Sequence, residues 1–339
     1  MRRVLVLQSE ALTKSEIKWL GSATYFGTHM QIVIPAAFLE FSRTAFSMCA
    51  AGIVLFGIGL WAARSDLVRD AGLDKIVALS NLCFAIPLAV FGALHLSAAH
   101  GLMTMVPNFI PWHLFWAYFV GFALMAASLS IATKIGVRWS GLLFGIMMFL
   151  FVAMLMIPGV FATPKDRFAW TFVFRESSFG SGGWLLAASA ILGGNVLRQQ
   201  NSGRGPRMLI TIGRTIIGIA AMFYGVEHFL HPLNVPGVPL EKIMPEWIPG
   251  RAIISYLTGA ILVVAGAAIL LNKKTRMAAT YLGTWIVLLV VFIYGPILIT
   301  SLLNPSTDVK VEGIDYFADT LLYAGAILAL ASATPRRDS

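Results

Sequence analysis

Charged side chains are scarce in this sequence of 339 residues, of which they make up only 12%. In soluble domains about a quarter of the residues are charged. Hydrophobic residues reach 58%, and the mean hydropathy is +0.79. A water-soluble fold of this length could not cover so much apolar surface, so we expect the lipid bilayer to surround most of the chain.

Cysteine is nearly absent as well. The two cysteines, Cys49 and Cys83, each lie in an apolar stretch, and no Cys-x-x-Cys motif occurs. This excludes a sequence-local thiol redox pair and a zinc knuckle. The sequence also lacks flavin and nucleotide motifs, and it has no basic stripe with interleaved aromatics. We therefore expect no nucleic-acid partner, and we assign the net charge of +9 to short cytoplasmic loops.

What the sequence does contain is a series of long apolar segments. A helix needs roughly 20 apolar residues to cross a hydrocarbon core of about 30 Å. Segments of that kind run near 44–62, 76–98, 114–133, 139–161, 179–197, 208–230, 252–271, 277–302 and 314–334. The sequence therefore predicts an all-α polytopic transmembrane bundle of about nine helices. Residues 1–43 read as an N-terminal interfacial or partly re-entrant segment, within which 19–41 is a candidate tenth span.

An internal repeat organises the chain. Gly92-Ala-Leu-His95, a Pro-Asn-Phe-Ile-Pro loop, Tyr118 and Gly121 return as Gly225-Val-Glu-His228, a Pro-Glu-Trp-Ile-Pro loop, Tyr256 and Gly259. Further on, Arg138 and Pro158 match Arg276 and Pro296 at one shared offset. The spacing predicts two parallel four-helix units, 75–197 and 198–339, preceded by an extra helix and loop in 44–74. Parallel units are related by a two-fold axis along the membrane normal.

These motifs resemble the DoxX/DoxD-like membrane protein family, over most of residues 75–334 and twice in tandem. The resemblance implies a bacterial inner-membrane subunit associated with respiratory or redox chemistry, with quinone as the ligand and other membrane redox subunits as partners. The first unit departs from the pattern, since Leu94 stands where the second unit has Glu227. The alternative is a non-enzymatic assembly factor, chaperone or small-molecule carrier, and whether the chain is an enzyme stays open.

Candidate catalytic residues gather at one helix end. Glu227, His228 and His231 lie within five residues, and spacings of four and three place His231 on one face with both others. A carboxylate and two imidazoles can relay protons to a quinol or ligate a metal, although the alternative is a wetted helix end before Pro232. Haem is disfavoured, because nothing in the sequence makes two imidazoles face each other. We predict no metal site.

Further residues are candidates for binding a ligand at the same end of the bundle. They are His95, Trp247, Tyr256 and Asp319. Arg214, a charge within an apolar segment, has two interpretations: it pairs with Asp319 or Glu227, or its long side chain extends to the inner surface.

The distribution of basic residues predicts the topology. With nine spans and a cytoplasmic C-terminus, the inner loops carry 13 basic residues and the outer loops six. This bias favours that orientation. A reporter enzyme that is active only in the periplasm, fused after Ser339, is expected to stay silent, and strong reporter activity would reverse the orientation.

Overall fold

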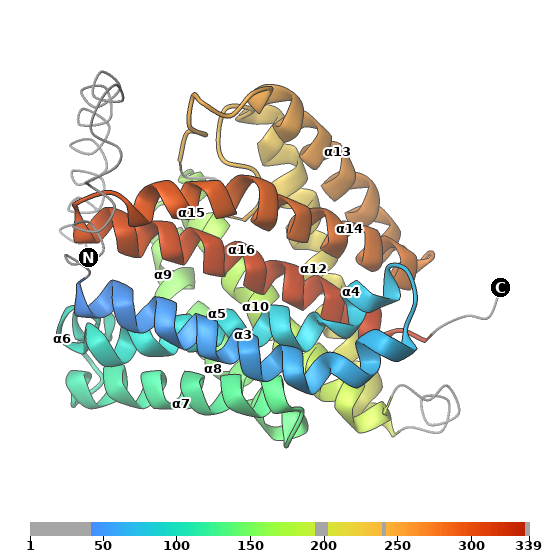
Figure 1. Cartoon of the computed structure of the whole chain (residues 1–339), viewed down its shortest axis with the longest axis horizontal. Coiled ribbons are helices and arrows are strands. Elements are labelled where there is room, and N and C mark those ends of the chain that lie inside the picture. The colour runs from blue at the N-terminus through green and yellow to red at the C-terminus, as the bar shows by residue number, and fades with distance from the viewer. Residues whose placement is uncertain (1–41, 194–202, 239–241, 336–339) are drawn as a thin grey trace.

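The computed structural model describes residues 42–193, 203–238 and 242–335, and every regular element in these ranges is a helix. The longer helices are α3 (Arg43–Arg69), α5 (Ser80–Ser97), α7 (His113–Thr133), α8 (Val137–Phe151), α10 (Arg167–Leu192), α12 (Arg204–Leu230), α13 (Arg251–Leu270), α14 (Thr275–Leu289) and α16 (Thr307–Ala333). The short elements are α4 (Asp74–Ala78), α6 (Ala99–Leu102), α9 (Ile157–Ala162), α15 (Gly295–Leu302), the 3₁₀ turn η1 (Met103–Met105), and the π-helical turns η2 (Val152–Met156) and η3 (Val290–Tyr294). The predicted all-α bundle is confirmed (Figure 1).

Eight helices within the described residues are long and apolar enough to cross a membrane. The sequence predicted about nine, and the difference is α10. This helix has 26 residues, enough to span a bilayer, but Arg175, Glu176 and several glycines and serines lower its hydropathy. It can carry them because α8, α12 and α16 pack around it. The predicted interfacial segment and the candidate tenth span lie in 1–41, outside the described residues.

Helices α10 and α16 form the centre of the bundle. Helix α16 packs against α5, α10 and α14, and it runs between α15 and α5 in Figure 1. In each half the first helix packs on the second, α5 on α7 and α12 on α13. The last helix of each half also packs on the first helix of the other, α10 on α12 and α16 on α5. A two-fold axis between α10 and α16 would produce these pairings, and the superposition of the halves stays a prediction.

The repeated motifs occupy equivalent places. A Cβ atom added to Gly92 would lie 3.1 Å from the Gly121 carbonyl, and one added to Gly225 would lie 3.0 Å from the Gly259 carbonyl. The absence of a side chain thus lets the first two helices of each half approach closely. Each half also contains a π-helical turn. The two turns begin at Val152 and Val290, 138 residues apart, and each is followed by a proline at the start of the next helix.

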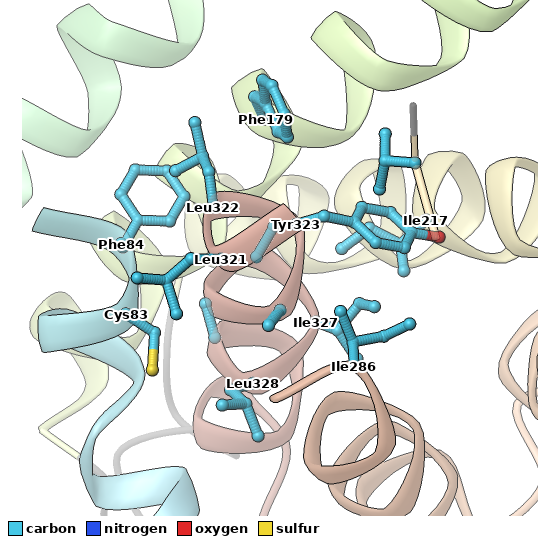
Figure 2. Packing of buried hydrophobic residues seen from close by; sticks show 14 of the residues in the cluster. Cys83, Phe84, Phe179, Ile217, Ile286, Leu321, Leu322, Tyr323, Ile327 and Leu328 are labelled. Carbon is cyan, nitrogen blue, oxygen red and sulfur yellow. The ribbon is translucent and has the colours of Figure 1, made fainter. Parts of the chain in front are cut away.

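The apolar core lies where the two halves meet. Figure 2 shows Phe84 of α5, Phe179 of α10 and Leu322 of α16 close together, with Cys83 beside them. Both cysteines are free, and Cys83 is buried. The backbones of α5 and α16 come closest at Gly325, where an added Cβ would lie 2.8 Å from the backbone nitrogen of Phe84. This contact joins the last helix of the second half to the first helix of the first half.

We therefore expect Gly325→Ala to lower the thermal midpoint of the purified protein in detergent by several degrees. The methyl group would meet backbone atoms, and such overpacking costs about 1–3 kcal/mol, against a gain in helix propensity of about 1 kcal/mol. Gly57→Ala is the matched control, because an added Cβ at this exposed glycine of α3 meets nothing within 4 Å. If both variants shift the midpoint equally, the close contact does not constrain the fold.

Candidate functional site

The candidate site lies at the end of the bundle that holds the C-terminus of α12 and the N-termini of α10 and α16. We call it the predicted outer end, after the charge bias of the loops. Helix α10 begins earlier than its hydropathy predicts, because the Asp166 side chain accepts a hydrogen bond from the Phe168 backbone N–H at 2.9 Å and caps it. Two of the six basic residues counted for the outer loops, Arg175 and Lys310, lie inside α10 and α16.

Glu227 is held between two basic groups at the end of α12. Its Oε2 atom lies 3.3 Å from Nη1 of Arg167 on α10 and 3.6 Å from Nε2 of His231. Glu227 is 8% exposed, whereas the His231 side chain is 38% exposed. The structure thus brings Glu227 and His231 together, as their spacing of four residues in a helix suggested. Arg167 was missed as a partner because it is 60 positions away in the sequence.

His228 occupies a different environment. It is fully buried, and its Nε2 accepts a hydrogen bond from the Gly237 N–H at 2.9 Å. An amide can only donate, so Nδ1 carries the ring proton and donates it to the Tyr224 carbonyl at 2.5 Å. Both ring nitrogens are used within the fold. The sequence suggested His228 as a proton relay, but its two hydrogen bonds give it the geometry of an anchor for the loop after α12.

That loop packs over the predicted outer end. Val235, Val238, Met244 and Ile248 are each at most 4% exposed. The Tyr294 hydroxyl donates to the Pro236 carbonyl at 2.6 Å, beside the His228 anchor. Gly237 has φ +122, a conformation that favours glycine, and a Cβ there would lie 3.4 Å from Cγ2 of Thr320. Gly237 thus reaches α16 next to Asp319.

A second group of charges lies deeper, between α10 and α16. Nη1 of Arg175 is 2.8 Å from Oδ2 of Asp319, and its Nε and Nη2 atoms are both 3.2 Å from Oε1 of Glu176. The three side chains are 13–14% exposed. Asp319 was a predicted ligand residue, whereas Arg175 and Glu176 were missed as site residues. The sequence did offer a signal for them, because two adjacent charged residues at the edge of an apolar segment are unusual.

Unused hydrogen-bonding capacity surrounds this pair. Oδ1 of Asp315 and the Tyr323 hydroxyl are buried and have no hydrogen-bond partner among the described residues. The neighbouring Tyr224 hydroxyl donates to the Thr171 carbonyl at 2.8 Å, and its ring meets that of Tyr323 edge-on at 5.8 Å. A buried polar atom without a partner requires an explanation, and a polar ligand group would provide one.

Aromatic rings line the same helices. Trp170 and Phe174 of α10 stack at 6.1 Å, and Phe174 lies 4.5 Å from Phe223 of α12. Phe223 in turn contacts Tyr224 at 5.4 Å. The row runs from partly exposed Trp170 to the buried Tyr224–Tyr323 pair. The aromatic row thus connects the surface of the bundle with the buried polar atoms between α10 and α16.

The remaining predicted residues lie apart from these charges. His95 belongs to α5, where its Nδ1 lies 2.8 Å from the Phe91 carbonyl. Trp247 is 52% exposed, and Tyr256 stacks on Phe229 at 6.1 Å. Within the described residues no group of three or more His, Cys, Asp or Glu could hold a metal ion.

Arg214 does not pair with Asp319 or Glu227, so that interpretation is wrong. Its Nη1 donates to the carbonyls of Ile269 and Leu270 at 2.7 and 3.0 Å, which caps the C-terminus of α13. The partners of the two carboxylates are instead Arg175 and Arg167, which project from α10.

No family model matches the chain, and no curated protein and no solved structure is detectably similar to it. The resemblance to the DoxX/DoxD-like family therefore rests on the repeated motifs alone.

The two equivalent histidines are expected to differ in their structural role. His228→Ala removes the acceptor of the Gly237 amide, and the loss of one buried hydrogen bond corresponds to roughly tenfold faster amide exchange. Hydrogen–deuterium exchange of residues 229–238 measures this. His95→Ala is the control and should leave that segment unchanged. Equal protection of the segment in both variants would show that His228 does not anchor the loop.

Proposed function

We propose that this chain is a DoxX-like, redox-associated subunit of the bacterial inner membrane that exchanges protons with a quinol at its predicted outer end. The observation that carries the proposal is the ion network built by three helices. Arg167 and Glu227 meet near the surface, and Arg175, Glu176 and Asp319 meet deeper in the bundle.

The cost of these charges supports a functional role. A charged residue in a membrane helix costs a few kcal/mol at the bilayer centre, and such residues usually mark ion or proton pathways. A buried ion pair is weak support for stability, because desolvation offsets the attraction between the charges. A network of three carboxylates and two arginines is therefore better explained by chemistry than by folding.

The arrangement suggests a division of tasks. Oxidation of a quinol releases two protons and two electrons. In the proposed role Glu227 receives the two protons one after the other, and His231, whose side chain is more exposed and lies 3.6 Å away, passes each to the surface before the next arrives. The aromatic row from Trp170 to Tyr323 holds the quinol ring. The electrons pass to a redox subunit bound beside this chain.

The tandem duplication belongs to the same proposal. The paired motifs, the matching π-helical turns and the crossed packing of first and last helices support two related four-helix units. Only the second unit has the carboxylate, since Leu94 replaces it in the first. We therefore propose one proton-exchanging site per chain.

Glu227→Gln is expected to lower quinol oxidation at least about a hundredfold, in membranes that contain the chain with its native partner subunits. The amide keeps the shape of the side chain and removes the proton acceptor, and general acid–base catalysis contributes about 10²–10⁴. Asp308→Asn is the matched control, because this exposed carboxylate lies in the first turn of α16 at the same end of the bundle. It should retain the wild-type rate.

Quinone in the lipid extract of the purified chain, measured by chromatography, provides an independent test. We expect it with the wild type and with Glu227→Gln, because the substitution affects proton transfer more than ring binding. A chain that carries no quinone, and whose Glu227→Gln variant oxidises quinol at the wild-type rate, would favour the non-enzymatic carrier or assembly role.

A further inference from the structure

A groove between α13 and α14 lies apart from the charged network, at the opposite end of the bundle. Its volume is about 850 Å³, within the usual range of small-molecule sites. Its wall is mostly apolar and includes Val264, Ala268, Met277 and Tyr281. Val264 and Tyr281 are 71% and 57% exposed, so the groove opens toward the lipid-facing surface. From Ala260 to Ala268 it follows α13 for about 12 Å.

The groove ends at two lysines. Lys273 and Lys274, in the turn between α13 and α14, line it and are exposed. No ion pair or hydrogen bond of either ammonium group is present within the described part of the chain. The neighbouring Arg276 is engaged elsewhere, with Asp74 at 2.6 Å and with the Ala331 carbonyl at 2.7 Å.

Local backbone geometry favours an anion at the same place. At the C-terminus of α13 the carbonyls of Ile269 and Leu270 already accept hydrogen bonds from Arg214 and not from the two lysines. Lys274 precedes α14 in a left-handed conformation with φ +50, and no side chain caps that helix. The first N–H groups of α14, which follow directly after the two lysines, therefore have no intrahelical partner.

The equivalent turn of the first half lacks these features. By the offset that relates Arg138 to Arg276, Ile135 and Gly136 stand in place of Lys273 and Lys274. The one lysine there, Lys134, forms an ion pair with Asp66 of α3. Of the two equivalent turns, only that of the second half carries a pair of adjacent lysines.

We propose that the α13–α14 groove binds an anionic phospholipid of the leaflet at the predicted inner end. The phosphate group lies against Lys273, Lys274 and the N-terminus of α14, and one acyl chain follows the apolar wall past Ala268 and Val264. The charge complementarity selects an anionic headgroup, and the length of the apolar wall requires a lipid rather than a free anion.

Native mass spectrometry of the purified full chain tests this with phosphatidylglycerol, phosphatidylcholine and inorganic phosphate as probes. The wild type should retain phosphatidylglycerol in preference to phosphatidylcholine. The double variant Lys273→Gln, Lys274→Gln should bind phosphatidylglycerol about thirtyfold more weakly, since each lysine near an anionic lipid contributes roughly fivefold. Ala268→Phe, which fills the apolar part and keeps both lysines, should also weaken binding.

Arg64→Gln, Lys75→Gln is the matched control. It removes two exposed positive charges from the same end of the bundle, outside the groove. It should leave the affinity for phosphatidylglycerol within about twofold of the wild type. Three results would overturn the proposal: equal loss in both double variants, equal retention of the two lipids, or displacement of phosphatidylglycerol by inorganic phosphate. If the lysine double variant does not fold, the single variants and Ala268→Phe decide in the same way.

Discussion

The contact between α10 and α16 is the feature on which the rest of this bundle depends. An added Cβ on Gly182 of α10 would lie 2.6 Å from the Cβ of Ala326 on α16, so the two helices touch almost backbone to backbone. Toward the other end, the hydroxyls of Ser189 and Ser332 lie 3.0 Å apart. With α8, α12 and α16 around it, α10 is shielded from lipid and can carry charged residues that a lipid-exposed helix could not. Because α10 and α16 are so close, Arg175 of one reaches Asp319 of the other.

The same burial explains what the sequence could and could not predict. Long apolar runs predicted the bundle and eight of its helices, since a lipid-facing helix must be apolar throughout. Helix α10 was placed too late in the chain, because Arg175, Glu176 and the two serines after them interrupt its apolar residues. At the site, the spacing of four residues correctly brought Glu227 to His231, a local relation that any helix fixes. The partnership of Glu227 with Arg167 and the anchoring of Gly237 by His228 depend on tertiary packing, which no local pattern records.

The network at the predicted outer end is shared between the two halves of the chain. Arg167, Arg175 and Glu176 come from the last helix of the first half, while Glu227 and Asp319 come from the second. Neither half contains the site by itself. This distribution follows from the crossed packing, in which the last helix of one half lies against the first helix of the other. Formation of the site therefore requires the halves to be docked.

Crossed packing creates a second place of the same kind, between α16 and α5, and its chemistry differs from that of the charged site. By the offsets of the repeat, Leu94 stands there for Glu227, and Val311 stands for Arg175. Both pack in an apolar cluster with Val90, Ala93, Ile314 and Ala318, and Ala45 and Met48 of α3 cover it. The extra helix α3 thus packs over this apolar cluster, while the charged position has the loop anchored by His228 beside it. Apolar residues suit the interface that α3 covers, whereas the charges of the other position are compensated by their ion pairs. The bundle therefore holds one apolar joint and one ionic site.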